Sequence, residues 1–192
     1  HIDQCIKLCA ENNDSLRLIN SLNAYAMLYT NCHLFDEALE QFDLQFKLKK
    51  HFTPYVEFNF YNSKGRMFYL KQDYPKAKSE FLKGLQVVPH DDTYAYMIIL
   101  LNLSETYLLL DNADSAKVHL DEVSKLGIGL ATMPVFNFYY NSLLGDYYAQ
   151  ENEFGKAKRA YDNADLIASG INVDKVLQKL HLQRKTKFLL SS

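Results

Sequence analysis

The sequence predicts an all-α protein in which four helical hairpins stack into an α–α superhelix, with an extra helix at each end. One observation is a pattern of small, aromatic and large apolar residues that returns about every 39 positions of the 192-residue chain, as in repeat architectures. The other is a series of helix start and stop signals that separates segments of helical length. We therefore expect a single repeat domain over residues 1–192, with repeats at 19–52, 58–91, 97–130 and 138–171.

The repeated register is defined relative to four alanines that are 39, 39 and 41 residues apart: Ala38, Ala77, Ala116 and Ala157. Twelve residues before each alanine stands a tiny side chain: Ala26, Gly65, Ser104 and Gly145. Nine residues before each stands an aromatic: Tyr29, Phe68, Tyr107 and Tyr148. Three residues before stand Phe35, Tyr74, Ala113 and Phe154, and four residues after stand Phe42, Phe81, Leu120 and Tyr161.

This spacing has a physical reason. A tiny residue in one helix lets a second helix cross close to its backbone, and the alanine of the second helix supplies the matching hollow. The large residues fill the space around this contact. No hairpin can bury so many aromatic side chains alone, so successive hairpins must stack.

The first element expected is an amphipathic helix in residues 1–13, because Ile2, Cys5, Ile6, Cys9 and Ala10 recur at helical spacing. It falls where the second helix of a preceding hairpin would lie, and the chain opens on His1 rather than methionine. These features suggest the hypothesis that the chain is a piece of a longer protein, cut within an earlier repeat.

Capping signals mark the helices that follow. Thr53 before Pro54, and Asp73 before Tyr74–Pro75, combine a capping side chain with proline in the first turn, and Pro89 ends a helix. The later signals are Asp91, Asp92 and Thr93, then Gly127 and Gly129, then Thr132–Met133–Pro134, and finally Asn152 and Gly170–Ile171–Asn172.

The last element, residues 172–190, has an apolar stripe and a basic remainder. The stripe is Val173, Val176, Leu177 and Leu180, and the basic residues are Lys175, Lys179, Arg184, Lys185 and Lys187. No tiny residue stands where a fifth hairpin would need one, which favours a capping helix. The alternative is a basic helix that touches a membrane or a nucleic acid.

At the repeated positions the chain resembles the tetratricopeptide repeat (TPR) family. Residues 58–91 give the fullest match, with Tyr61, Gly65, Phe68, Tyr74, Ala77, Phe81, Gly84 and Pro89, and residues 138–171 follow with Leu144, Gly145, Tyr148, Phe154, Ala157, Tyr161 and Ala164. The other two repeats depart from the pattern, since Lys50 and Ile128 replace the closing proline and Ala113 replaces an aromatic. The family repeat is shorter than 39 residues, and the longer repeats here resemble those of some bacterial peptide-sensing regulators. The motif residues of this family maintain packing, so the resemblance implies an architecture more than a function.

Composition and motifs exclude several functional classes. A net charge of −2 argues against a nucleic-acid-binding face, and no apolar run is long enough for a membrane span.

Cys5 and Cys9 share a helix face, but buried small hydrophobic residues explain such cysteines better than a metal site does. His119 and Glu122, one helical turn apart, are more typical of a solvated pair than of metal ligands. We expect no catalytic residues, no cofactor and no metal site. An enzyme would need a deep pocket in which groups such as Arg66, Glu105 and Asp146 converge.

What remains is a binding surface. In the resembled family the first helix of each hairpin lines a concave groove, and the helical period places ten candidate residues there: Asn20, Asn23, Asn59, Asn62, Arg66, Tyr69, Leu101, Asn102, Glu105 and Tyr139. Side-chain amides can donate to and accept from a peptide backbone, and Arg66 could hold a carboxylate or a phosphate. The competing interpretation is that these asparagines solvate an empty groove or pair with neighbouring helices.

The sequence thus favours a non-catalytic scaffold or recognition domain of a larger bacterial protein that binds a protein or peptide. The alternative is a sensory module that binds a signal peptide or small ligand and controls an attached kinase or DNA-binding domain.

Some TPR domains bind the acidic tails of chaperones through a clamp of lysine, asparagine and arginine. The matching positions are Asn23, Met27, Ser63, Ile98 and Asn102, so three clamp cations are missing and that partner is not expected. Unpaired thiols favour the cytoplasm, with the periplasm as the alternative for a segment of a membrane-anchored sensor.

Overall fold

The computed structural model describes residues 4, 14–89, 91–127, 132–171, 173 and 175–191. This part of the chain contains nine α-helices and one 3₁₀ helix and no β-strand. The helices are α2 (Ser15–Asn31), α3 (Phe35–Phe46), α4 (Pro54–Leu70), α5 (Tyr74–Val87), α6 (Thr93–Leu109), α7 (Ala113–Lys125), α9 (Pro134–Gln150), α10 (Phe154–Ser169) and α11 (Lys175–Ser191), with η1 at Lys49–His51. The all-α class is confirmed. The helix expected in residues 1–13, with Cys5 and Cys9, lies outside the described residues apart from Gln4.

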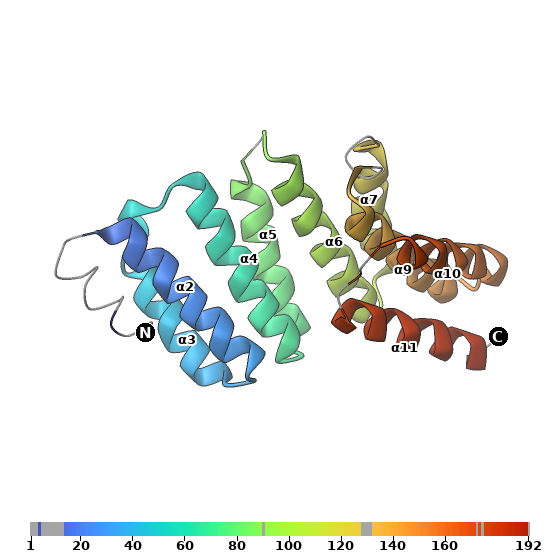
Figure 1. Cartoon of the computed structure of the whole chain (residues 1–192), viewed down its shortest axis with the longest axis horizontal. Coiled ribbons are helices and arrows are strands. Elements are labelled where there is room, and N and C mark those ends of the chain that lie inside the picture. Colours follow the sequence, from blue (N-terminus) through green and yellow to red (C-terminus); the bar gives the residue numbers. More distant parts are fainter. Residues whose placement is uncertain are drawn as a thin grey trace. The chain divides into compact units, whose positions relative to one another are not determined.

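The helices pack as consecutive antiparallel pairs, α2 with α3, α4 with α5, α6 with α7, and α9 with α10 (Figure 1). The chain divides into two compact units, His1–Asp92 and Thr93–Ser192, named unit 1 and unit 2 below. Unit 1 contains the first two pairs, and unit 2 contains the other two together with α11.

The close approach predicted at the tiny residue of the register is present between α4 and α5, but the ring of Phe81, rather than Ala77, lies nearest to the glycine. A Cβ built on Gly65 would lie 2.5 Å from two ring carbons of Phe81. The same contact recurs between α9 and α10, where a Cβ on Gly145 would lie 2.5 Å from the ring of Tyr161. Both rings are almost fully buried. Glycine is therefore required at these positions because the partner ring occupies the space of a side chain.

The four turns within the pairs share one backbone conformation. Each contains one residue in the left-handed region: His33 (φ 59°), Gln72 (φ 63°), Asp111 (φ 52°) and Asn152 (φ 60°). The next residue donates its N–H to the carbonyl five residues earlier, as Asp73 does to Phe68 at 2.9 Å. These carbonyls belong to Tyr29, Phe68, Tyr107 and Tyr148. The geometry is that of a Schellman motif, so the repeat includes the turns as well as the packing residues.

Most helix starts follow the expected signals. The side chains of Thr53 and Asp73 accept from the N–H groups of Val56 and Lys76, both at 3.3 Å. Pro89 lies two residues beyond the end of α5. One expectation differs: α9 begins at Pro134 with Met133 as its N-cap and no side-chain cap. Thr132 stands one residue too early to cap α9, and Pro134 alone favours this start because its fixed φ suits the first turn.

In unit 1, Phe60 of α4 connects the two hairpins. Its buried ring lies 5.9 Å from that of Phe42 on α3 and 5.7 Å from that of Phe46. Phe52, just after η1, contributes a third ring at 5.6 Å. Helix α4 also packs against α2 and α3. Aromatic pairs at these separations stabilise the contact beyond the area they bury.

In unit 2, α9 packs against α6, α7, α10 and α11. The capping helix predicted near the end of the chain is present as α11. It covers the α9–α10 pair through Phe188, whose ring lies 5.4 Å from that of Tyr161, and through the buried His181, 5.1 Å from Phe138.

Candidate functional site

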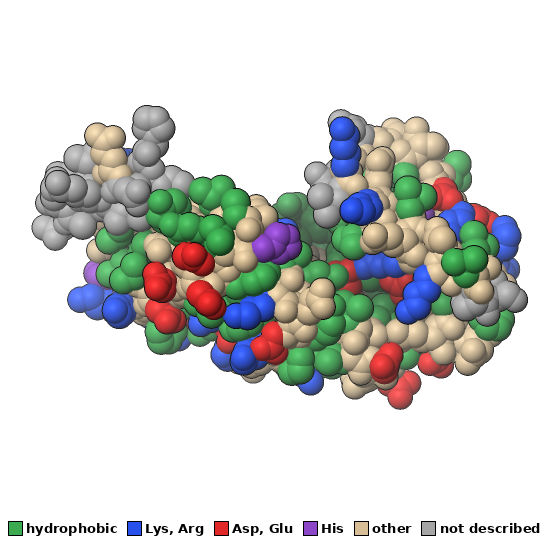
Figure 2. All heavy atoms as spheres, turned by 90° about the horizontal axis from the view of Figure 1, so that it is seen from below, with side chains coloured by type: hydrophobic (Ala, Val, Ile, Leu, Met, Phe, Trp, Pro, Cys, Tyr) green, Lys and Arg blue, Asp and Glu red, His purple; other side chains and the backbone are tan. Residues whose placement is uncertain are grey.

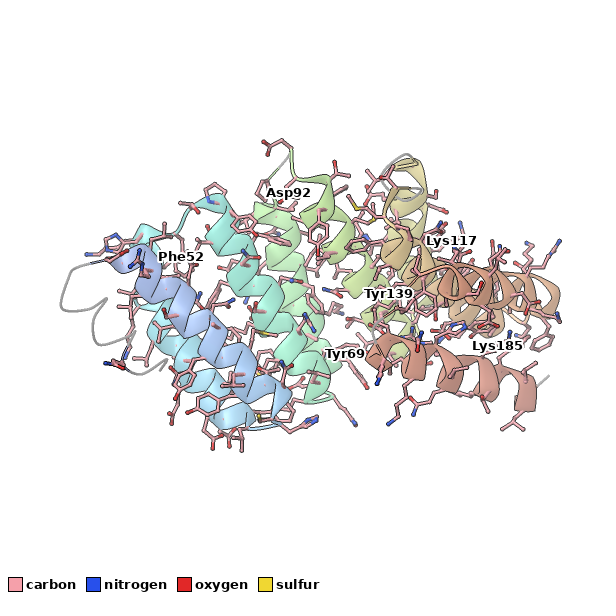
Figure 3. All side chains as sticks on the ribbon, viewed as in Figure 1. Phe52, Tyr69, Asp92, Lys117, Tyr139 and Lys185 are labelled. Carbon is pink, nitrogen blue, oxygen red and sulfur yellow. The ribbon has the colours of Figure 1, made fainter. Side chains whose placement is uncertain are left out.

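Six of the ten candidate residues lie in unit 1, on the neighbouring helices α2 and α4. We name this set the polar face of unit 1: Asn20, Asn23, Asn59, Asn62, Arg66 and Tyr69. Asn20 and Arg66 are exposed, and the other four are half-buried. The ring of Tyr69, labelled in Figure 3, lies 5.8 Å from that of Tyr74.

Two features of this face are suited to binding a polar ligand. Arg66 is exposed, and no described residue forms an ion pair or hydrogen bond with it. The side-chain oxygen of Asn23 is buried and has no hydrogen-bond partner among the described residues. A guanidinium offers several donors to a carboxylate, whereas the Asn23 oxygen lies beneath the surface and can pair with a ligand only if its side chain turns outward.

The four candidates in unit 2 have different surroundings. Asn102 and Tyr139 are half-buried, whereas Leu101 is fully buried and Glu105 is 6% exposed. Leu101 and Glu105 therefore correct the sequence-based projection, because they do not line a surface. The reason is that ten of the 17 residues of α6 are buried, so its helical period does not define one solvent-facing stripe.

Glu105 instead belongs to a buried charge cluster with Tyr139 and Asp146 of α9 and Arg184 of α11. The guanidinium of Arg184 pairs with Glu105 and lies 2.9 Å (Nε to Oδ2) from Asp146. The hydroxyl of Tyr139 donates to Glu105. Tyr139 is labelled in Figure 3. One cation thus holds two carboxylates from two different helices.

Further polar groups extend the cluster into α10. The hydroxyl of Tyr161 donates to Asp146 at 2.7 Å. The ring of His181 lies between the Ser142 hydroxyl, 3.1 Å away, and the Asp165 carboxylate, 2.9 Å away. Lys185, also labelled in Figure 3, pairs with Asp165 and lies 3.0 Å from Asp162. Three consecutive helices of the unit are therefore joined to α6 through polar contacts.

The electrostatics of the cluster reflect its burial. Burial raises the pKa of Asp146 to about 7, and the hydrogen bond from Tyr161 opposes the rise. The nearby guanidinium of Arg184 also favours the charged carboxylate. Burial likewise raises the pKa of Tyr161, and the charge of Asp146 raises it further.

At the edge of the cluster the shifts run the other way. Burial alone would raise the pKa of Asp165, but hydrogen bonds from Lys185 and His181 hold it below its ordinary value. Hydrogen bonds from Lys158 and Lys185 lower the pKa of Asp162. These two carboxylates are therefore stabilised in the charged form.

Two of the three groups named above for an enzyme, Glu105 and Asp146, converge on Arg184 of the same unit. Their oxygens are already bonded to Arg184, Tyr139 and Tyr161, so the cluster joins helices and presents no free base. Within the described ranges, no three His, Cys, Asp or Glu side chains form a group that could hold a metal ion.

The role of Arg184 was not readable from the sequence. The sequence shows only a basic residue in a basic helix, and its partner Glu105 is 79 residues away. The one available signal was the position of Arg184 on the same helix face as Leu177 and Phe188, which predicts that it points inward.

Comparison with known proteins adds no relative. No protein-family model matches the sequence, and no curated protein matches it either. None of the described helices has both the length and the apolar character that crossing a membrane requires.

Proposed function

We propose that the chain is a TPR-like helical-repeat domain that binds a protein or peptide and catalyses no reaction. The repeated register supports the TPR-like solenoid, since the tiny residue, the large residue 16 positions later and the left-handed turn residue recur in all four hairpins. The buried carboxylates of unit 2 support a non-catalytic role because they are bonded within the protein.

The polar face of unit 1 is the binding site in this proposal. The observation that carries it is Arg66, an exposed cation without an intramolecular partner among the described residues. Asn59 stands seven residues earlier on the same helix, two turns away, so both side chains lie on one face. A guanidinium and several amides on adjacent helices fit an extended peptide that carries a carboxylate, with the amides pairing to its backbone.

The test is a selection of peptides from a random displayed library on the intact chain. Affinities of the selected peptides are then measured for the wild type and for Asn59→Ala with Arg66→Ala. We expect the double variant to bind at least about tenfold more weakly, because a charge-assisted hydrogen bond is lost at a desolvated contact.

The matched control is Asn163→Ala with Arg159→Ala, which removes the same two side-chain types from exposed positions of α10. It should bind like the wild type, and both double variants should keep wild-type helicity by circular dichroism. If no peptide is enriched, or if both pairs of substitutions have equal effects, the proposal is wrong.

A further inference from the structure

Helix α11 has two faces of different character. The inward face carries His181 and Phe188, which are 3% and 5% exposed. The outward face carries Leu182 and Leu190, which are 58% and 84% exposed. Around these leucines stand the remaining members of what we name the outer face of α11: Lys175, Lys179, Thr186 and Lys187, all exposed. An apolar stripe bordered by polar residues is the pattern of a helix that packs on both sides.

Among the described residues, the charges of α11 form ion pairs on the inward side alone. Arg184 is paired with Glu105 and Asp146, and Lys185 with Asp162 and Asp165. By contrast, no described carboxylate pairs with any of the three outward lysines. The helix contains no acidic residue. The outer face therefore presents three lysines without an ion pair among the described carboxylates beside two exposed leucines, although the whole chain is negative at −2. The charge of one of them, Lys187, also acts on Asp146, whose pKa it lowers.

We propose that the outer face of α11 is a second docking surface and that its partner is an acidic amphipathic helix of another protein. Leucine side chains of the partner would cover Leu182 and Leu190, and its carboxylates would pair with Lys179 and Lys187. Both pairs are eight residues apart, which corresponds to about 12 Å along the helix axis. A partner helix whose acidic residues are also two helical turns apart contacts both lysines at once. This surface is separate from the polar face of unit 1 and does not depend on the function proposed there.

The surroundings favour a protein over two other anionic partners. A nucleic acid needs a continuous basic footprint, but the exposed carboxylates Asp162 and Asp165 adjoin α11. A membrane-surface helix carries aromatic and many apolar residues on its buried side, whereas Gln178, Gln183 and Thr186 interrupt the leucines here. Figure 2 shows blue basic side chains scattered among green hydrophobic, red acidic and tan ones over unit 2, without a continuous basic area.

The test uses the full chain and two synthetic, fluorescently labelled helical peptides. One peptide carries leucines along one face with glutamates at both edges, and the other has glutamine at every glutamate. Binding is followed by fluorescence anisotropy at low and high salt. We expect the glutamate peptide to bind at least about tenfold more tightly, with an affinity that falls as salt screens the charges.

Two variants locate the site. Lys179→Glu with Lys187→Glu should abolish binding of the glutamate peptide, and Lys47→Glu with Lys50→Glu in unit 1, the same change of charge, should leave it unaltered. Leu182→Gln with Leu190→Gln should also abolish binding, whereas Leu166→Gln, at a position 73% exposed on α10, should not. All of these positions are exposed, so we expect wild-type helicity in every variant.

Three outcomes would overturn the proposal. Equal affinity for the two peptides would remove the role of charge, and unchanged binding after substitutions in α11 would place the site elsewhere. The third is binding to vesicles of phosphatidylcholine and phosphatidylserine, but not to the peptide, in a manner that Lys179→Glu with Lys187→Glu abolishes. That result would make the outer face of α11 a lipid-binding surface instead.

Discussion

Gly65 and Gly145 show how much one missing side chain contributes to this fold. Each lies in the middle of the first helix of a pair, where glycine is normally unfavourable by about 1 kcal/mol relative to alanine. Here the rings of Phe81 and Tyr161 occupy the volume in which a Cβ would lie. Ala26 and Ser104 stand at the corresponding positions of the other two pairs, and both are fully buried. These four positions therefore require a small side chain, and the ring opposite determines whether a Cβ fits.

The first prediction compares two glycines with opposite surroundings. Gly65→Ala should destabilise the protein by about 1–3 kcal/mol, because the ring of Phe81 has to move from a packed position. Gly155→Ala should stabilise it by up to about 1 kcal/mol, since nothing lies within 4 Å of a Cβ built there. Urea unfolding followed by circular dichroism measures both changes, and a stabilising Gly65→Ala would contradict the packing described here.

At the scale of an element, the repeated unit is a helix pair together with its turn. All four turns place a residue with a side chain in the left-handed region, at His33, Gln72, Asp111 and Asn152. Asparagine, aspartate and histidine are found in this conformation more often than other residues with a side chain, whereas glutamine is strained in it. The two hydrogen bonds of the turn, from Gln72 to Tyr69 and from Asp73 to Phe68, hold the strained residue in place.

The second prediction follows from that strain. Gln72→Gly should stabilise the protein by about 1 kcal/mol, because glycine adopts φ near 63° without a steric penalty. The gain is reduced by the greater freedom of glycine in the unfolded chain. Glu40→Gly, at an exposed position within α3, serves as the control and should destabilise by roughly 0.5–1 kcal/mol. Thermal unfolding distinguishes the two, and equal losses would show that the turn is not strained.

At the scale of the whole molecule, each of the two units has its own means of joining helices. Unit 1 joins its hairpins through aromatic rings around Phe60. Unit 2 joins α6, α9 and α11 through Arg184 and two carboxylates, a buried charge cluster of the kind that is weakly stabilising when complete and costly when broken. The outward lysines of α11 form no ion pair with the described residues of this cluster, and Lys187 acts on it through its charge, which lowers the pKa of Asp146.

The third prediction concerns the pH dependence of unit 2. Arg184→Met should destabilise the protein by about 3–5 kcal/mol near neutral pH, because two buried carboxylates lose their cation. Burial raises the folded-state pKa of Asp146 to about 7 in the intact protein, and the loss of the Arg184 cation favours the protonated form further. A carboxyl with a raised folded-state pKa binds protons more readily in the folded state. The variant should therefore recover stability as pH falls from about 8 to about 5.

The wild type should show the same trend more weakly, because the charge of Arg184 favours the ionised form of Asp146. The folded-state pKa values of Asp162 and Asp165 lie below their ordinary values, so their contribution is present above the unfolded pKa and is lost only as pH falls through the folded one. Adding Asp146→Asn and Glu105→Gln to Arg184→Met should remove the pH-dependent recovery. Arg159→Met on the exposed side of α10 is the control. A uniform loss of stability at every pH in Arg184→Met would contradict the role given to the cluster.

The sequence by itself determined the helical class, the pairing of helices along the chain, the capping by Thr53 and Asp73, and the close packing at Gly65. These features depend on local rules of capping and on residue size at a fixed register, which a single sequence displays. Only the tertiary structure decided that the ring of Phe81 lies against Gly65, that Leu101 and Glu105 are buried, that Arg184 meets Asp146, and that the chain divides into two units. Such pairings join side chains up to 79 residues apart and depend on the rotation of each helix about its axis. That rotation is set by the packing of all neighbouring helices together, and no local pattern in the sequence records it.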